Sequence, residues 1–506
     1  MRSSMRIIVI GGGYGGLASA TLLAASGHTV SLYEKNQSLG GKAGMLEVGG
    51  FRFDTGPSWY LMPEVFKHYF KLLKEKPEDY YTLKRLDPAY RVFYQDSDAI
   101  DIHSDLKSDK AAFEALEAGA STQLQAYLKD AKYKYNVSMQ RFLYKNYDKL
   151  TDFLTPEVLR EAPKLQLFEK MHPYVRRFFT QEKLQKIMEY PLVFLGASPF
   201  NAPALYSLMS HVDFNQGVFY PDGGIYSVTE AMVTLATKHG VDLHTDTAVK
   251  RIMVTKKRAS GVELESGEII EADLVISNTD RHFTETVLLP EKSRDHSERY
   301  WKKRTLAPSA LLLYLGVQGK LPALTHHNLL FSSDWKKNFA QIFDSPEWPD
   351  KPSLYVCKPS ASDKSVAPKD CENLFVLVPI AAGLKYTQSE LDKYIDHILE
   401  TIETSMSVPA LREKLVVKRS FCVKDFESTY NSFQGTALGL AHTLRQSALW
   451  RPNNTSKKVK NLLYVGADTN PGIGLPMALI SAELAVKRII KDTTPGPLKK
   501  LPKKLK

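Results

Sequence analysis

The sequence predicts an α/β fold whose main domain is assembled from segments that lie far apart in the chain. Three observations support this prediction: a glycine-rich turn between a strand and a helix near the N-terminus, a block of strand and helix patterns in residues 216–284, and a strand, turn and helix in residues 456–490. Alternating strands and helices are typical of domains built on a parallel sheet. The long stretches between the blocks are then insertions.

The first block is a nucleotide-binding pattern. Residues 6–10 form a short β-branched run suited to a strand that is buried on both faces. The spacing G-x-G-x-x-G follows at Gly11, Gly13 and Gly16, a helix-like segment of small and apolar residues follows at 17–26, and a second strand ends on Glu34. The glycine motif alone is weak, but strand, glycines, helix, strand and acid within about thirty residues strongly predict a Rossmann-type dinucleotide-binding domain.

Each part of this pattern has a physical role. Gly11 permits a tight turn, Gly13 lets the backbone approach a pyrophosphate, and Gly16 lets helix and strand pack closely. The helix N-terminus offers free N–H groups and a partial positive charge to phosphates. Glu34 would accept hydrogen bonds from a ribose, and its charge disfavours a 2′-phosphate. A second glycine-rich loop at 38–44 replaces the helix expected in an NAD-binding half, which favours FAD.

The last block would complete the cofactor site. Residues 461–468 read as a strand that ends with Gly466 and Asp468, and residues 469–476 form a loop rich in glycine and proline. The helix predicted at 477–490 is apolar on most of its surface, so its N-terminus can point at a polar ring edge. Asp468 could bind ribityl or pyrophosphate-side hydroxyls, and amides near Met477 could face a flavin pyrimidine. The alternative is a helix that only closes the core.

Taken together, these segments resemble the bacterial-type carotenoid (phytoene) desaturases of the flavin amine-oxidase superfamily. The resemblance spans about residues 5–490 and is carried by residues 9–16, 40–42, 53–57, 198–204, 220–224, 430–435 and 466–476. It implies FAD as cofactor and a polyene hydrocarbon as substrate. It also implies hydride transfer from a substrate carbon to flavin N5, followed by loss of a proton.

The resemblance also implies roles for single residues. Glu34 would hold the adenosine ribose, Lys42 would lie near the pyrophosphate, and Val249 would contact the adenine. Thr55 and Gly56 would lie close to the isoalloxazine, and Asp468 would hold the polyol chain. Many relatives have His-Pro-Gly where this chain has Asn470-Pro471-Gly472. Asn470 is therefore expected near the flavin, without a role in proton relay, and no other catalytic residue is identified.

These expectations divide the chain into alternating parts. The FAD-binding domain would comprise residues 1–70, 216–284 and 456–490, and an inserted α+β region for substrate and membrane would comprise residues 71–215 and 285–455. Residues 176–179 and 190–195 mix cations or aromatics with apolar groups, as a surface resting on lipid does. The basic, proline-containing residues 491–506 are expected to be a disordered tail.

Charge and composition limit the partners. The formal net charge is +11, which suits an anionic lipid surface, a nucleic acid or a solvated face without a partner. The basic residues form no nucleic-acid module, so nucleic acid is not expected. No signal peptide and no apolar run of spanning length are found, so we expect a cytoplasmic protein peripherally associated with the inner face of the cell membrane. Oxygen and membrane quinone both remain open as electron acceptors.

The histidines and cysteines suggest no site of their own. Cys357, Cys371 and Cys422 are widely spaced, which predicts neither a metal site nor a disulfide framework and fits a reducing compartment. The adjacent His326 and His327 are expected in a loop. Beside the desaturase, a flavin-dependent carotenoid isomerase or oxygenase, an amine oxidase and a non-catalytic flavin-binding membrane partner remain as alternatives.

Overall fold

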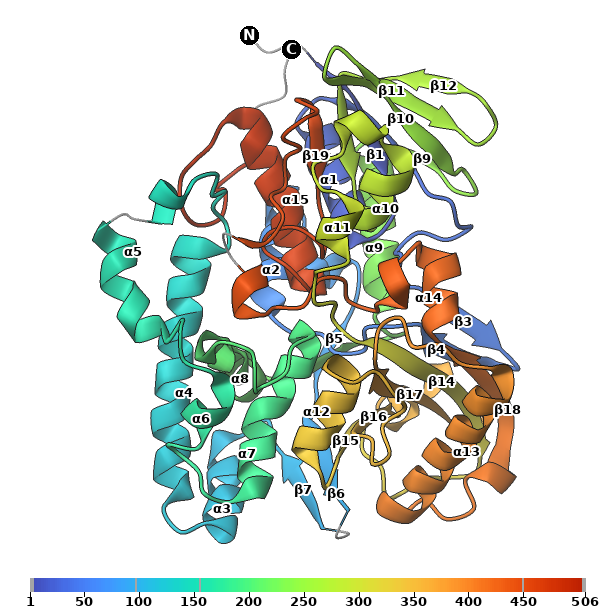
Figure 1. The fold of residues 1–506 in the computed structure, drawn as a ribbon. Helices are drawn as coiled ribbons and strands as arrows, with labels where there is room; N and C mark the ends of the chain where they lie inside the picture. The colour runs from blue at the N-terminus through green and yellow to red at the C-terminus, as the bar shows by residue number, and fades with distance from the viewer. Residues whose placement is uncertain (1–3, 96–97, 154–155, 448–449, 503–506) are drawn as a thin grey trace.

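Five parallel strands drawn from three separate parts of the chain form one sheet in a computed structural model, which describes residues 4–502 except 96–97, 154–155 and 448–449. The strands lie in the order β19 (Leu462–Tyr464), β13 (Leu274–Ser277), β1 (Arg6–Ile10), β2 (Thr29–Tyr33) and β9 (Asp242–His244). Segments from the start, middle and end of the sequence therefore lie side by side (Figure 1).

Apolar residues cover both faces of this sheet, as the β-branched run at residues 6–10 predicts. Ile7 and Val9 pack on one side, and Ile8 and Ile10 pack on the other. The first side is covered by helices α1 (Tyr14–Ala25), α2 (Pro63–Leu72), α9 (Tyr226–Lys238) and α15 (Leu475–Ile490). The second side is covered by a small antiparallel sheet of β10 (Val249–Thr255), β11 (Arg258–Leu264) and β12 (Ile269–Glu271).

A second, mixed sheet of seven strands forms the base of the inserted region (Figure 1). Only the β15–β6 pair is parallel among the strand pairs that the structure describes in this sheet. In order, its strands are β18 (Leu415–Phe421), β14 (Ser309–Gln318), β17 (Cys371–Ile380), β16 (Leu354–Cys357), β15 (His327–Phe331), β6 (Tyr90–Tyr94) and β7 (Ala99–Ile102).

The two faces of the seven-stranded sheet bury different cores. Helix α13 (Gln388–Ser405) packs on one face through Leu391, Ile395 and Ile398, and a Thr387–Glu390 capping box begins this helix. The other face shares a core with a group of helices and holds the apolar end of the cavity described below. These helices are α3 (Leu106–Leu116), α4 (Ala120–Val137), α6 (Met171–Val175), α7 (Glu182–Glu189) and α12 (Trp335–Phe343).

Two short antiparallel pairs connect the two sheets. One is the hairpin β3 (Met45–Val48) to β4 (Phe51–Asp54), and the other pairs β5 (Leu83–Arg85) with β8 (Phe219–Pro221). No helix in the described part of the chain combines the length and the apolar composition needed to cross a membrane.

The C-terminal segment corrects the prediction of disorder for residues 491–506. Leu498 is buried, and its amide donates to the carboxylate of Glu483 on α15. The Lys487 ammonium, also buried, donates to the carbonyls of Thr494 and Gly496. A buried ammonium needs such acceptors, so it holds the segment against the helix despite the disorder-promoting composition. Residues 503–506 lie outside the described residues.

Candidate cofactor and substrate site

One cavity of about 1160 Å³ runs from the five-stranded parallel sheet to the seven-stranded sheet. Its polar end lies at the carboxyl ends of β1, β2, β13 and β19, where parallel α/β sheets bind their ligands. Its apolar end lies against β14, β15 and β17. The cavity therefore joins the three nucleotide-binding segments to the inserted region.

The glycine turn at the polar end lies against the cavity and packs closely on its protein neighbours. Gly11 has φ +96°, Gly13 precedes the first turn of α1, and both line the cavity. A Cβ on Gly15 would lie 2.6 Å from Asn278 Oδ1. Gly16 does not line the cavity, and a Cβ there would lie 2.0 Å from the carbonyl oxygen of Gly11, so it serves helix–strand packing. No side chain caps α1, so its first amides are free for an anion.

Glu34 is buried at the end of β2 and lines the cavity. The Gly12 amide donates to its Oε2 at 2.7 Å, and the backbone and side-chain nitrogens of Asn36 donate to Oε1 at 2.9 and 2.8 Å. A carboxylate offers about four acceptor positions, so capacity remains for one further donor. The glycine turn and the acid thus fix each other's positions.

Lys42 lies at the same end of the cavity, near one carbonyl oxygen and two carboxyl groups. Its Nζ donates to the Ala437 carbonyl at 2.7 Å, and burial lowers its pKa while Asp468 and Asp280 act in the opposite direction. Burial and the neighbouring Asp468 raise the pKa of Asp280 to about 7, although amides of Phe433 and Phe283 donate to it.

Asp468 follows β19 and Gly466, and both line the cavity. Its carboxylate accepts from the amides of Arg281 and Leu440, each at 3.2 Å. Gly466 has φ +97°, and a Cβ there would lie 2.7 Å from Asn278 Oδ1. Asn278 therefore touches the glycine turn and this strand end together.

Two glycine-containing motifs that are far apart in the sequence meet beside the cavity. Asp54, at the end of β4, accepts hydrogen bonds from the amides of Ile225 and Tyr226 at the start of α9. A Cβ on Gly224 would lie 2.6 Å from that carboxylate, which explains the glycine. The contact positions the next residues, Thr55 and Gly56, along the cavity wall. The Thr55 hydroxyl is buried at this wall, close to the Tyr430 hydroxyl.

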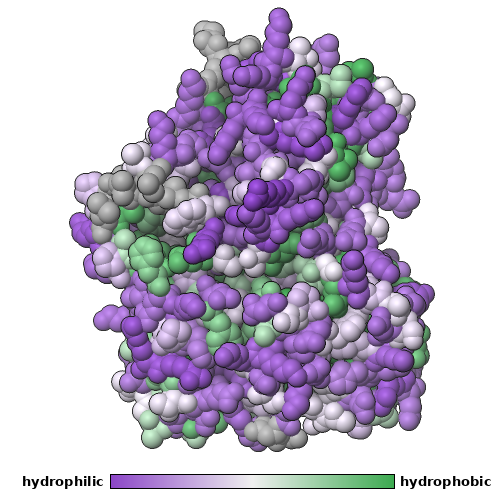
Figure 2. All heavy atoms as spheres, viewed as in Figure 1, coloured by the Kyte–Doolittle hydropathy of each residue, from purple (hydrophilic) through white to green (hydrophobic). Residues whose placement is uncertain are grey.

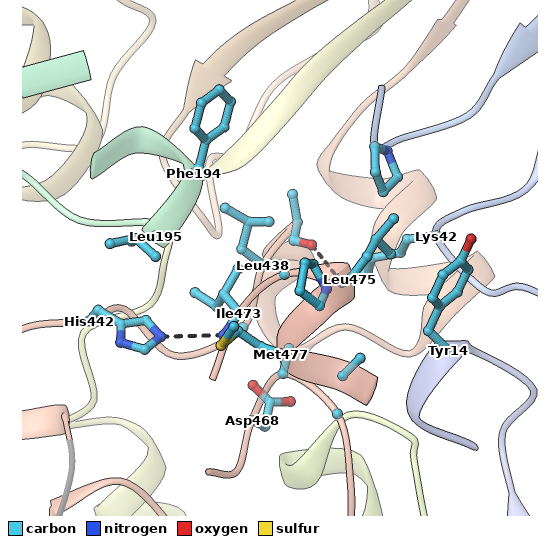
Figure 3. Close-up of a pocket in the computed structure, with 18 of the residues that line it drawn as sticks. Tyr14, Lys42, Phe194, Leu195, Leu438, His442, Asp468, Ile473, Leu475 and Met477 are labelled. Carbon is cyan, nitrogen blue, oxygen red and sulfur yellow. Dashed lines mark hydrogen bonds between the residues drawn. The ribbon is translucent and has the colours of Figure 1, made fainter. Parts of the chain in front are cut away.

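Helix α15 points its N-terminus into the middle of the cavity, where Met477 lies in its first turn (Figure 3). The helix begins at Leu475, two residues before the predicted start, with Pro476 in a position that the first turn tolerates. No side chain caps it, so its amides are free. Asn470 lies in the preceding loop and also lines the cavity.

The loop before α15 is held from behind by His442. The Ile473 amide donates to His442 Nε2 at 3.3 Å, and Nδ1 lies 2.8 Å from the Tyr206 hydroxyl (Figure 3). Burial lowers the pKa of His442, so the ring is neutral. A Cβ on Gly472 would lie 2.3 Å from Nε2, so only glycine fits over the ring.

Apolar and aromatic side chains line the other end of the cavity. Phe194 and Leu195 stand on one side of the pocket, opposite Tyr14 and Lys42 (Figure 3). Further walls come from the strands of the large sheet and from the helical region: Leu312, Leu329, Phe331, Leu377, Trp59, Leu205 and Met209. The described residues that line this end include no carboxylate.

The structure corrects two predictions in the inserted region. Residues 190–195 do not rest on the surface: Tyr190, Leu192 and Leu195 are buried, and most of the segment walls the cavity. His327 is not a loop residue, because it begins β15, whereas His326 lies in the loop before that strand, as predicted; both side chains are buried. Contacts between segments far apart in the sequence bury residues 190–195 and place His327 in a strand, and local composition does not reveal such contacts.

Of the predicted cofactor residues, the structure brings Gly11, Gly13, Glu34, Lys42, Thr55, Gly56, Val249, Gly466, Asp468, Asn470 and Met477 to one cavity. Sequence reasoning missed Asn278 and Asp280, which also line it. A signal for them existed, since both follow the predicted strand at 273–277 and carboxyl ends of parallel strands carry ligand-binding residues.

These residues fit FAD. The uncapped start of α1 suits a diphosphate, the buried Glu34 suits a ribose, and the uncapped start of α15 suits the polar edge of a flavin. The glycines let the backbone pack closely at this end, where an added Cβ at Gly15 or Gly466 would collide with Asn278. FAD would thus be held along the polar half of the cavity.

Comparisons with known proteins agree with this geometry. Residues 14–490 match the family described as flavin containing amine oxidoreductase. A carotenoid 3,4-desaturase of Haloarcula japonica is 47% identical over 96% of this chain and 98% of its own length. A ζ-carotene-forming phytoene desaturase of Myxococcus xanthus is 36% identical over 96% and 94%. A 4,4′-diapophytoene desaturase of Staphylococcus haemolyticus is 32% identical over 97% and 100%.

Solved structures show the same fold at low sequence identity. An oxidoreductase from Methanosarcina mazei superposes with a TM-score of 0.65 at 17% identity, covering 96% of this chain and all of its own. Putrescine oxidase bound to putrescine gives 0.64 at 13% identity, covering 97% and 99%. Because the family match and the relatives cover nearly the whole sequence, the chain belongs to the flavin-containing amine oxidoreductase family and is an FAD-dependent oxidoreductase.

Proposed function

We propose that the chain is a carotenoid desaturase that oxidises a long polyene in the apolar half of the cavity. The observation that carries this proposal is the apolar wall that continues directly from the cofactor end. The three desaturases that share at least 32% identity with the chain support it independently. The substrate is phytoene or a related, more unsaturated carotenoid precursor.

When bound, FAD supplies a two-electron oxidant that takes a hydride from carbon. The protein holds the polyene in place and keeps water out. Leu312 and Leu377 from the large sheet and Phe194 from the opposite wall enclose an apolar chain. Hydride loss leaves an allylic cation spread over the polyene, and the adjacent proton is acidic. This end of the cavity therefore needs apolar walls rather than a carboxylate base.

We propose the following roles for the cofactor residues, which are the roles that the family resemblance implies. Glu34 would hold the adenosine ribose, Val249 the adenine, and Lys42 with the start of α1 the pyrophosphate. Asp468 would hold the polyol chain. Thr55, Gly56 and Asn470 would lie close to the isoalloxazine, and the amides near Met477 would face its pyrimidine edge. All of these residues line the one cavity, which supports the assignment.

We also propose that the cavity mouth rests on a lipid surface at the inner face of the cell membrane. Phe168, Trp450 and Leu444 line the cavity although 83%, 58% and 37% of each remains exposed. Figure 2 shows hydrophobic side chains on this flank of the molecule, near α5 (Pro156–Glu161). The exposed Lys164 and Arg445 are their neighbours in sequence, and each basic group near an anionic leaflet contributes about 1 kcal/mol.

The alternatives make different demands on this cavity. An amine oxidase needs a site for a cationic substrate, and the described walls at the apolar end offer no carboxylate to balance its charge. A carotenoid isomerase of the same fold would use the same walls. It differs in that its substrate undergoes no net loss of two electrons.

The proposal is tested by anaerobic mixing of the FAD-loaded protein with liposomes that contain phytoene, then lycopene. Flavin absorption and the polyene bands are followed together. Flavin bleaching with a longer conjugated product is expected for at least one substrate. Rearranged polyene with an unbleached flavin would instead establish the isomerase, and bleaching by amines alone would establish the amine oxidase. Subsequent addition of oxygen or of a membrane quinone identifies the acceptor by the return of flavin absorption.

A further inference from the structure

We propose that His326, His327 and Cys357 form a buried binding site for one copper(I) ion, behind the wall of the substrate cavity. One ligand atom from each residue can be chosen so that all three lie within 4.8 Å of one another. His327 and Cys357 are direct partners in the β15–β16 ladder, and His326 precedes β15. All three residues are at most 4% exposed.

The hydrogen bonds of the two imidazoles point to a ligand. His326 Nδ1 lies 2.9 Å from the Ser362 hydroxyl, and His327 Nδ1 lies 2.7 Å from the Tyr355 hydroxyl. Both Nε2 atoms are buried and have no partner. A histidine that ligates a metal holds its other ring nitrogen in such a hydrogen bond, which fixes the ring orientation. Leaving two buried ring nitrogens unsatisfied would cost free energy that a shared ion removes.

The ligand set selects the type of ion. A thiolate with two imidazoles is a soft donor set that suits copper(I). On binding, the Cys357 thiol releases its proton to solvent, so copper(I) and the thiolate together carry no net charge. Zinc(II) with the same ligands would leave one positive charge in a buried place, which is costly. No oxidation or reduction is involved.

The site would stabilise one wall of the substrate cavity. The His327 ring stacks on the Trp59 indole, with centroids 4.4 Å apart and planes 10° from parallel. Trp59 itself lines the cavity. An ion that fixes His327 would therefore fix this indole. Spacing along the chain gave no sign of this site, because strand pairing alone brings Cys357 to the histidines.

The test uses the full-length, FAD-loaded protein. It is incubated without oxygen with copper(I), or separately with zinc(II), then gel-filtered against a competing chelator, and retained metal is measured per chain. We expect one copper ion per chain and loss of retention in Cys357→Ser. The matched control Cys371→Ser, which removes a thiol outside the cluster, should retain copper as the parent protein does.

X-ray absorption on the parent protein makes the test independent of how the variant folds. One sulfur and two imidazole nitrogens are expected around the copper. The proposal is overturned if copper is not retained, if only zinc is retained, if Cys357→Ser binds as well as the parent, or if the copper shell lacks sulfur. A buried water that bridges the two nitrogens would give the first of these results.

Discussion

The Gly12 amide donates a 2.7 Å hydrogen bond to the carboxylate of Glu34, so the glycine turn after β1 and the acid at the end of β2 form one unit. A ligand that meets one of them meets the other in a fixed position. This relationship makes Glu34 a direct probe of the cofactor site.

We expect Glu34→Gln to weaken FAD binding roughly 10- to 100-fold, since a hydrogen bond to a charged group contributes about 1.5–3 kcal/mol. The amide keeps one acceptor oxygen and turns the other position into a donor that opposes the Gly12 or Asn36 amide. Fluorescence titration of the apoprotein with FAD measures the change. Glu268→Gln, on the exposed β11–β12 turn, should bind FAD as the parent does. Equal affinity in both variants would contradict the assignment.

Gly16→Ala should destabilise the protein by about 1–3 kcal/mol or more and reduce FAD content, because its Cβ would meet the Gly11 carbonyl at 2.0 Å. Urea denaturation followed by circular dichroism measures the loss. Gly119→Ala is the control, because it replaces a glycine without creating a steric clash. Gly119 has φ +84° but open space around it, so only backbone strain of about 1–2 kcal/mol applies. A smaller loss at Gly16 than at Gly119 would count against close packing.

FAD affinity should fall as pH rises from about 6 to 8, and Asp280→Asn should flatten this dependence. The pKa of Asp280 is about 7 in the folded protein, because burial and Asp468 disfavour its charged form. The protonated acid tolerates the negative diphosphate of FAD better than the carboxylate does, so deprotonation weakens binding. The same raised pKa also affects stability. Between about pH 4 and 7 the folded apoprotein holds a proton on Asp280 that the unfolded chain has released, so the contribution of Asp280 to the free energy of unfolding declines as the pH rises through this range.

Titrations of FAD at several pH values, with Asp396→Asn on the exposed face of α13 as control, measure this effect. An unchanged slope in Asp280→Asn would assign the dependence to another group.

Leu195→Trp should abolish polyene oxidation while FAD content and dithionite reduction of the flavin stay normal. The larger side chain projects into the apolar half of the cavity, whose wall Leu195 forms (Figure 3). Leu195→Met conserves volume and should keep most activity. Product analysis of liposome assays provides the comparison. Full turnover by the tryptophan variant would place the polyene elsewhere.

Replacing both Phe168 and Trp450 by Ser should reduce binding to anionic liposomes by roughly 10-fold or more, since burying one large apolar side chain contributes about 1.5–3 kcal/mol. Co-sedimentation measures binding. The double change Ile269→Ser with Val416→Ser is the control, because these large apolar side chains are also exposed, at 58% and 57%, but do not line the cavity. If both double variants lose binding equally, the cavity mouth is not the docking surface.

The sequence predicted the nucleotide half of the site because its geometry is encoded locally. A strand, three glycines, a helix and Glu34 follow one another within one segment, and the structure reproduces that order with α1 beginning earlier than predicted, at Tyr14. The predicted strand at 273–277 and the terminal helix also form. FAD and the desaturase family followed from the joint pattern of these segments, and the comparisons confirm both.

What the sequence did not reveal depends on contacts between distant segments. Asn278 and Asp280 reach the glycine turn only because β13 pairs with β1. His326 and His327 become buried only once β15 lies between β16 and β6. The composition of the C-terminal segment predicted disorder. The segment is ordered because Lys487, on the preceding helix α15, donates to its carbonyls, and no local sequence pattern reveals that contact.

The order of strands in the nucleotide-binding sheet has a consequence for biosynthesis. Strand β1 leaves the ribosome first, but its sheet lacks an edge until Leu462–Tyr464 has been made, and α15 follows later still. At roughly 5–20 residues per second, the interval is about 20–90 s. During that time α1, which packs with α15 in one core, exposes apolar surface to chaperones and proteases. We therefore expect FAD to bind only after translation, and a chain that ends before β19 to hold no FAD.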